Sequence, residues 1–124
     1  NIYAGPKDTL QNSISLFKSV AFENGREEKQ LEITTACPPV VGLTKESVDN
    51  SLISAAKALI QPEDEIAKNW QDRSYLYGTP EEVVKTLSMW QEVGIEAVYL
   101  QLLDLEQSKR DESVEVIQKA INLL

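Results

Sequence analysis

Most hydrophobic positions along the chain repeat at the spacing of one helix face, and two short apolar runs interrupt that spacing. The helix with the most clearly specified ends lies in the stretch 79–94. Thr79 is a typical N-cap, and Glu82 stands three residues later, where it completes a capping box. Gly94 is a typical helix stop. We therefore predict a helix whose two ends are both encoded locally.

The residues after this helix predict a strand. Ala97–Leu103 is almost continuously apolar or aromatic and lacks the polar alternation of a half-exposed strand. Such runs are typical of parallel sheets that helices cover on both faces. We expect this strand to be buried, with neighbouring strands on both of its sides.

The remaining pattern alternates strands with helices. The expected elements are, in chain order, a helix capped by Asp8 or Thr9 and stopped at Asn24-Gly25, a strand from Leu31 to near Cys37, a helix capped by Thr44, a short helix from Pro62, and a last helix with an apolar stripe from Val114 to Leu124. Pro38-Pro39 interrupts the first strand because proline donates nothing to a ladder, so Val40-Val41 is expected at an edge or after a bulge. The alternation predicts an α/β fold of parallel βα units.

Two predicted strands do not make a self-sufficient sheet. A two-stranded sheet is marginal in water, and each strand would leave an outer edge unpaired. The missing neighbours must come from further chain or from other subunits. We therefore expect a homo-oligomer that forms through open strand edges.

Composition narrows the classes of partner. The 124 residues suit a single domain, and 20 acidic against 12 basic residues give a net charge of -8. The basic residues are dispersed, which argues against nucleic acid and against anionic membrane surfaces. The chain contains no long apolar span and no signal-like N-terminus, so we expect neither a membrane-spanning nor an exported protein.

Residue counts also exclude several kinds of chemistry. The chain has no histidine, which removes the usual zinc ligand, the usual general base and every Ser-His-Asp or Cys-His arrangement. Cys37 is the only cysteine, so no internal disulfide can form and a cytoplasmic location is the simpler expectation. No metal site is predicted.

Four phrases along the chain resemble one family when taken in order. They are AFENGR at 21–26, LEITTACPPVVGLTKE at 31–46, YGTPEEV at 77–83 and EVGIEAVYL at 92–100. Their order and spacing resemble the C-terminal part of luciferase-like flavin-dependent oxidoreductases. The resemblance spans most of the chain.

This resemblance implies a (β/α)8 TIM barrel, of which residues 1–124 would be a C-terminal fragment, since a complete barrel needs about 250 residues. It also implies FMN or a deazaflavin coenzyme at the C-terminal face of the barrel. Most cofactor and catalytic residues of the family lie on earlier strands. No residue of this chain can be matched to a catalytic base, and the small-molecule substrate stays unknown.

Gly78 and Thr79 are the candidate cofactor-binding residues. They stand at a helix N-terminus, where free N–H groups and the helix dipole favour an anion such as a cofactor phosphate. Glu81 and Glu82 already bring negative charge to this end, so plain capping is the favoured alternative.

Other candidates each have a structural alternative. Cys37 could be a reactive thiol, but no histidine is present to activate it, which favours a buried structural role. The aromatic residues Trp70, Tyr75 and Tyr77 could cover a flat ring or belong to a core or interface. Acidic residues at 63–65 suit a helix start better than a calcium loop. Asp104 and Glu106 follow the last strand, where barrel enzymes keep functional groups, or are solvated loop residues.

Two hypotheses about function follow. The first is a partial luciferase-like flavin-dependent monooxygenase or oxidoreductase domain that is catalytically incomplete by itself. The second is a non-enzymatic oligomeric α/β module for assembly or partner binding.

Overall fold

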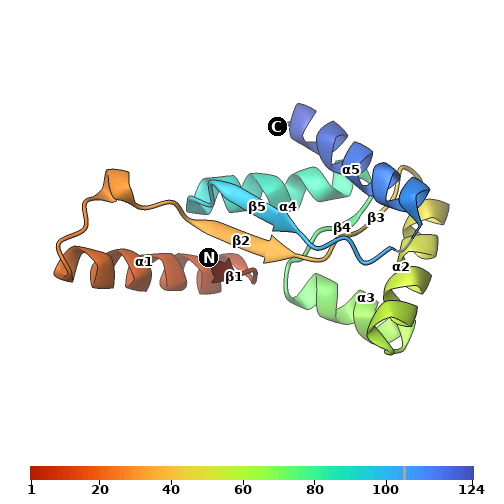
Figure 1. Ribbon diagram of the computed structural model, residues 1–124, viewed down its shortest axis with the longest axis horizontal. Coiled ribbons are helices and arrows are strands. Elements are labelled where there is room, and N and C mark those ends of the chain that lie inside the picture. The colour runs from red at the N-terminus through yellow and green to blue at the C-terminus, as the bar shows by residue number, and fades with distance from the viewer. Residues whose placement is uncertain (105) are drawn as a thin grey trace.

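The computed structural model describes residues 1–104 and 106–124 (Figure 1). The described helices are α1 Lys7–Glu23, α2 Lys45–Leu59, α3 Glu63–Asp72, α4 Pro80–Val93 and α5 Gln107–Asn122, with a single 3-10 turn, η1, at Glu28–Gln30. The described strands are β1 Ile2–Tyr3, β2 Thr34–Cys37, β3 Val40–Val41, β4 Tyr77–Gly78 and β5 Ala97–Leu100. The predicted α/β class with parallel strands is confirmed.

The described strands form two parallel sheets. The larger sheet has the order β1-β2-β5, and the smaller one pairs β3 with β4. In the larger sheet, Tyr3 is opposite Ala36, which in turn is opposite Tyr99. Within each sheet the strands lie in the order in which they occur along the chain, although β3 and β4 of the smaller sheet come between β2 and β5 in sequence. A closed or partly closed barrel is not confirmed by this arrangement.

Two hydrophobic clusters lie on the two sides of the Pro38-Pro39 step. The larger cluster joins β2 to α1, α4 and α5, and its large buried members include Leu10, Cys37, Leu76, Trp90 and Val116. The smaller cluster lies under α2 and α3 and comprises Val40, Ala55, Ile66 and Trp70. Figure 1 shows the same division, with α2 and α3 at the end of the molecule away from α1.

Most predicted helix ends are confirmed. Thr79 and Glu82 form the capping box of α4, and Gly94 ends that helix with a left-handed φ of 97°. The Thr44 hydroxyl accepts from the Ser47 amide at 3.2 Å at the start of α2. The predicted Asp8 or Thr9 cap of the first helix is wrong, because α1 begins at Lys7. Its N-cap is Pro6, whose extended backbone leads directly into the helix.

The strand boundaries differ from the prediction. The strands β1 and β4 were not predicted, because two residues are too few to show a period. The last strand ends at Leu100 rather than Leu103. Leu100 is opposite Cys37, and the Gln101 amide still donates to the Cys37 carbonyl. The next residue of this segment that would face β5 is Pro39, which has no N–H to continue the ladder.

The expected burial of the last strand on both faces is wrong for this chain. Tyr99 on β5 is 62% exposed, and Tyr3 on β1 is 93% exposed. The register places both tyrosines on the same face of the larger sheet. Helices of the described chain therefore leave this sheet face open to solvent around the two tyrosines.

The two tryptophans differ in their hydrogen bonding, and this difference gives a stability prediction. The Trp70 Nε1 donates to the Pro38 carbonyl at 2.7 Å. The Trp90 Nε1 is buried and has no partner among the described residues. Trp70→Phe loses ring volume and leaves a carbonyl unpaired, whereas Trp90→Phe loses ring volume and removes an unpaired donor. We expect Trp70→Phe to lower the free energy of unfolding by about 1–3 kcal/mol more than Trp90→Phe. Urea denaturation of both variants measures this difference, and equal or reversed costs would contradict it.

Candidate functional site

The candidate site lies at the carboxyl ends of β3 and β4, where each strand is followed by a helix. The Val40 amide donates to the Leu76 carbonyl at 3.0 Å, and the Gly42 amide donates to the Gly78 carbonyl at 3.2 Å. Strand β3 then leads through a short turn into α2, and β4 leads directly through Thr79 into α4. The N-termini of two helices therefore begin at the same edge of the smaller sheet.

The N-terminus of α4 is closed by its own side chain. The Thr79 amide donates to the Glu82 Oε2 at 2.9 Å. Gly78 has a φ of 110°, and a side chain there would collide with the Glu82 carboxylate. Glu82 therefore occupies the position that a phosphate would take, and the geometry favours the capping alternative for Gly78 and Thr79.

Electrostatics at this end of α4 also oppose an added anion. Burial raises the pKa of the Tyr77 hydroxyl above its ordinary value, and the carboxylates of Asp49 and Glu82 raise it further. Both carboxylates disfavour the negatively charged, deprotonated form of the Tyr77 hydroxyl. A phosphate would meet the same two charges.

The aromatic candidates are arranged edge to face rather than as a flat platform. The ring centroids of Trp70 and Tyr75 lie 5.3 Å apart with an interplanar angle of 89°. Trp70 is buried in the smaller cluster, and its Nε1 donates a hydrogen bond to the Pro38 carbonyl. The Arg73 guanidinium carbon lies 6.0 Å from the Tyr75 ring centroid, at the limit of a cation–π contact. These contacts assign Trp70 and Tyr75 to packing.

Cys37 is fully buried in the larger cluster. Burial raises the pKa of its thiol to about 11, although a hydrogen bond with the backbone of Leu76 lowers the pKa in part. The thiolate is the nucleophilic form, so a protonated and inaccessible thiol is a poor nucleophile at neutral pH. The structural role is the one that the geometry supports.

The acidic candidates have ordinary roles in the fold. Glu63, Asp64 and Glu65 form the first turn of α3, where negative charge is favourable. Among the residues that the structure describes, no group of three candidate ligands is placed to hold a metal ion. Because α3 begins at Glu63, the predicted helix start at 63–65 is confirmed.

Asp104 and Glu106 stand on either side of Leu105, which lies outside the described residues. Both line an open groove of about 290 Å³ between α2 and the start of α5. The Lys109 Nζ lies 3.9 Å from the Glu106 Oε1 and donates to the Ser54 Oγ at 3.2 Å. A lysine thus accompanies the two acids, and their charge is partly balanced within the groove.

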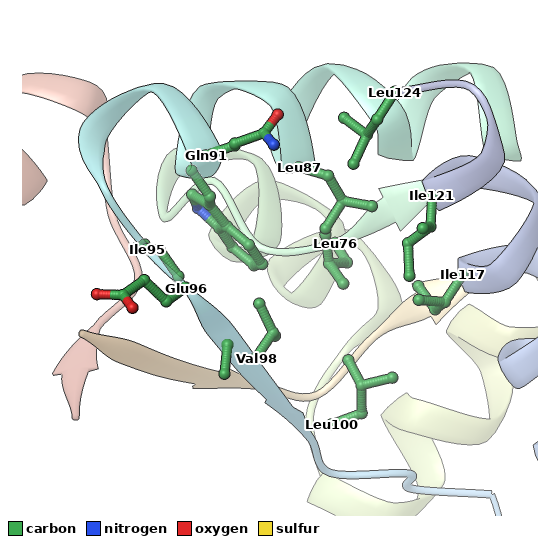
Figure 2. A pocket seen from close by; sticks show the side chains of 12 residues that line it. Leu76, Leu87, Gln91, Ile95, Glu96, Val98, Leu100, Ile117, Ile121 and Leu124 are labelled. Carbon is green, nitrogen blue, oxygen red and sulfur yellow. The ribbon is translucent and has the colours of Figure 1, made fainter. Parts of the chain in front are cut away.

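An apolar groove that the sequence did not indicate lies between α4, α5 and β5 (Figure 2). Its volume is about 270 Å³. Figure 2 shows Leu87 on α4 and Ile121 on α5 facing the strand that carries Val98 and Leu100. The apolar stripe of the last helix continues to Leu124, beyond the residues that the core buries. These additional apolar residues were the one sequence feature that could have indicated the groove.

Comparison of the chain with protein-family models, curated proteins and solved structures finds no match. In the part of the chain that the structure describes, every helix is too short or too polar to cross a membrane.

Gly78 is the position at which the cap can be tested. Gly78→Ala places a side chain at a left-handed φ and against the Glu82 carboxylate. We expect a loss of at least about 1–3 kcal/mol in the free energy of unfolding, from overpacking and backbone strain together. Gly5→Ala is the matched control, because its new side chain would make only ordinary contacts with Thr9. Equal stability of the two variants in urea would contradict the proposed role of Gly78.

The buried thiol predicts a dependence of stability on alkaline pH. The pKa of Cys37 rises from 9.0 to about 11 on folding, so the stabilising contribution is complete below pH 9 and is lost as pH rises through 11. The full effect is roughly 3 kcal/mol. Urea denaturation between pH 8 and pH 11 measures it. Cys37→Val is the control, because it cannot ionise and should lose less stability over this range. Identical pH profiles would contradict the prediction.

Proposed function

We propose that this chain is part of a luciferase-like flavin- or deazaflavin-dependent oxidoreductase and supplies βα units from the end of a (β/α)8 barrel. The observation that carries the proposal is the strand order β1-β2-β5, which equals the chain order in a fully parallel sheet. Barrels wind in one direction and keep this order. Doubly wound sheets reverse it at a switch point.

The open sheet face supports the same proposal. Side chains of barrel strands point alternately to the barrel interior and to the surrounding helices. Here Val98 and Leu100 contact the helix-covered core, while Tyr3 and Tyr99 project from the opposite face. In a barrel, that opposite face would be the interior, which further strands would close.

The described residues do not by themselves fit a flavin phosphate. Glu82 accepts the hydrogen bond of the Thr79 amide at the N-terminus of α4, so this amide cannot donate to a phosphate until the Glu82 side chain moves. Asp49 and Glu82 add unfavourable charge. In our proposal the cofactor is held mainly by strands other than those of this chain, and no catalytic step is assigned to its residues.

A second candidate function is a non-enzymatic assembly module that forms a homo-oligomer. The sheet ends in unpaired edges at β1 and β5, and the apolar groove lies beside β5. Both features suit recognition of a protein strand. A cytoplasmic location is part of either proposal and agrees with a protonated, unpaired Cys37.

Flavin titration separates the two functions. The 124-residue protein is titrated with oxidised and reduced FMN and with a deazaflavin, and binding is followed by absorbance and fluorescence. The enzyme proposal expects saturable binding that is weak for an incomplete site. Glu82→Gln weakens the charge at the α4 N-terminus and should tighten phosphate-dependent binding if Gly78 and Thr79 contribute. Riboflavin, which lacks the phosphate, is the ligand control. No saturable binding to wild type or variant would contradict the flavin proposal for this chain.

A further inference from the structure

The groove between α2 and the start of α5 lies beyond the carboxyl end of β5. In Figure 1 the chain leaves β5 toward α2 before it turns into α5. Ligands of parallel α/β proteins bind at the carboxyl ends of the strands, in open sheets as well as in barrels. The side chains around this groove come from α2, from α5 and from the loop between β5 and α5. Its lining is therefore the same whichever strand pairs with β5.

Two lysines of the groove carry unused hydrogen-bond donors. The Lys109 Nζ donates to the Ser54 Oγ at 3.2 Å, whereas its distance of 3.9 Å from the Glu106 Oε1 is too long for a hydrogen bond. Lys57 lies three residues after Ser54 on α2 and has no hydrogen-bond or ion-pair partner among the described residues. Each ammonium group has three donors, so most of this donor capacity is left for a bound anionic group.

The loop that follows β5 contributes unused acceptors to the same groove. The Arg110 Nη1 donates to the backbone carbonyl of Asp104 at 3.2 Å, which ties this loop residue to α5. The Asp104 carboxylate has no partner among the described residues, and the Glu106 carboxylate has only Lys109, at 3.9 Å. Asp104 and Lys57 line one groove without forming an ion pair with each other. A cationic group bound here would therefore find two carboxylates.

We propose that this groove binds a small zwitterion with the chemistry of a free amino acid. The carboxylate of the ligand contacts Lys57 and Lys109, and its ammonium group contacts Asp104 and Glu106. These four side chains balance one another in charge, although the whole chain carries a net charge of -8. A simple anion would meet both acids, and a simple cation would meet both lysines. A ligand that carries both charges is therefore the complementary one.

The size and the apolar part of the groove narrow the ligand further. Its volume of about 290 Å³ lies at the lower end of the range of small-molecule pockets. Ala58 and Leu103 add apolar lining, and Leu103 also packs against the smaller hydrophobic cluster. An amino acid with an aliphatic side chain, such as L-leucine, matches both the charges and this lining.

Three ligands that differ only in charge test the proposal. L-leucine carries both charges, L-leucinamide lacks the carboxylate, and 4-methylpentanoate lacks the ammonium group. The 124-residue protein is titrated with each at neutral pH, and binding is followed by calorimetry and by amide chemical shifts. We expect saturable binding of L-leucine, with a dissociation constant at least about tenfold below those of both analogues. Absence of saturable L-leucine binding, or equal binding of all three ligands, would overturn the proposal.

Two variants assign the two kinds of charge in the groove. Lys57→Met keeps the apolar stem and should weaken binding of L-leucine and of 4-methylpentanoate about three- to fivefold, while L-leucinamide binding stays unchanged. Asp104→Asn should weaken L-leucine and L-leucinamide to a similar extent and leave 4-methylpentanoate unchanged. Lys45→Met is the matched control, because this exposed lysine lies on the same helix but outside the groove. Equal effects of Lys45→Met and Lys57→Met on L-leucine binding would contradict the assignment of the groove.

Folding and flavin binding are checked separately. Far-UV circular dichroism shows whether each variant folds, and the three-ligand comparison with the wild type decides the proposal if one does not. The inference does not rest on the flavin proposal, because none of the three ligands contains a flavin and either titration can fail without the other.

Discussion

The inability of proline to donate a backbone hydrogen bond organises this molecule. At Pro38-Pro39 the ladder between β2 and β5 stops, and the chain resumes as β3 in a different sheet beside β4. The same step divides the core, so that Cys37 belongs to the larger cluster and Val40 to the smaller one. Trp70 secures the step by donating to the carbonyl of Pro38. The N-termini of α2 and α4 lie at one edge because β3 and β4 are paired there.

Several polar groups near that edge are occupied by the fold itself. Glu82 closes the α4 helix that Thr79 begins, and Lys109 accompanies Glu106 in the neighbouring groove. Cys37 is protonated and buried. Among the described residues, the larger sheet keeps unpaired outer edges at β1 and β5 and a solvent-exposed face around Tyr99. The proposed function therefore concerns which strands complete the sheet and which cofactor the completed sheet holds.

Agreement between sequence and structure is good where a signal is local. Helix α4 was predicted at both ends because a capping box and a left-handed glycine act within one turn. Helix α1 began earlier than Asp8 because Pro6 imposes the extended entry that a side-chain cap would otherwise provide. The candidate Gly78-Thr79 was placed correctly at a helix start. The alternative that Glu82 simply caps this helix was also predicted from the sequence, and the hydrogen bond from the Thr79 amide to Glu82 agrees with it.

The sequence by itself determined the order of the described α-helices and of strands β2, β3 and β5, the α/β class and the break at Pro38-Pro39, because caps, periodicity and the missing proline N–H act over a few residues. Only the tertiary structure decided that β1 and β4 are strands, since two residues acquire strand geometry through a distant partner. It also decided that the apolar run after Ala97 pairs only as far as Leu100, because pairing depends on the partner strand as much as on the run itself. The exposure of Tyr99 follows from the same fact: burial is a property of what packs against a residue, which its own neighbours in sequence do not encode.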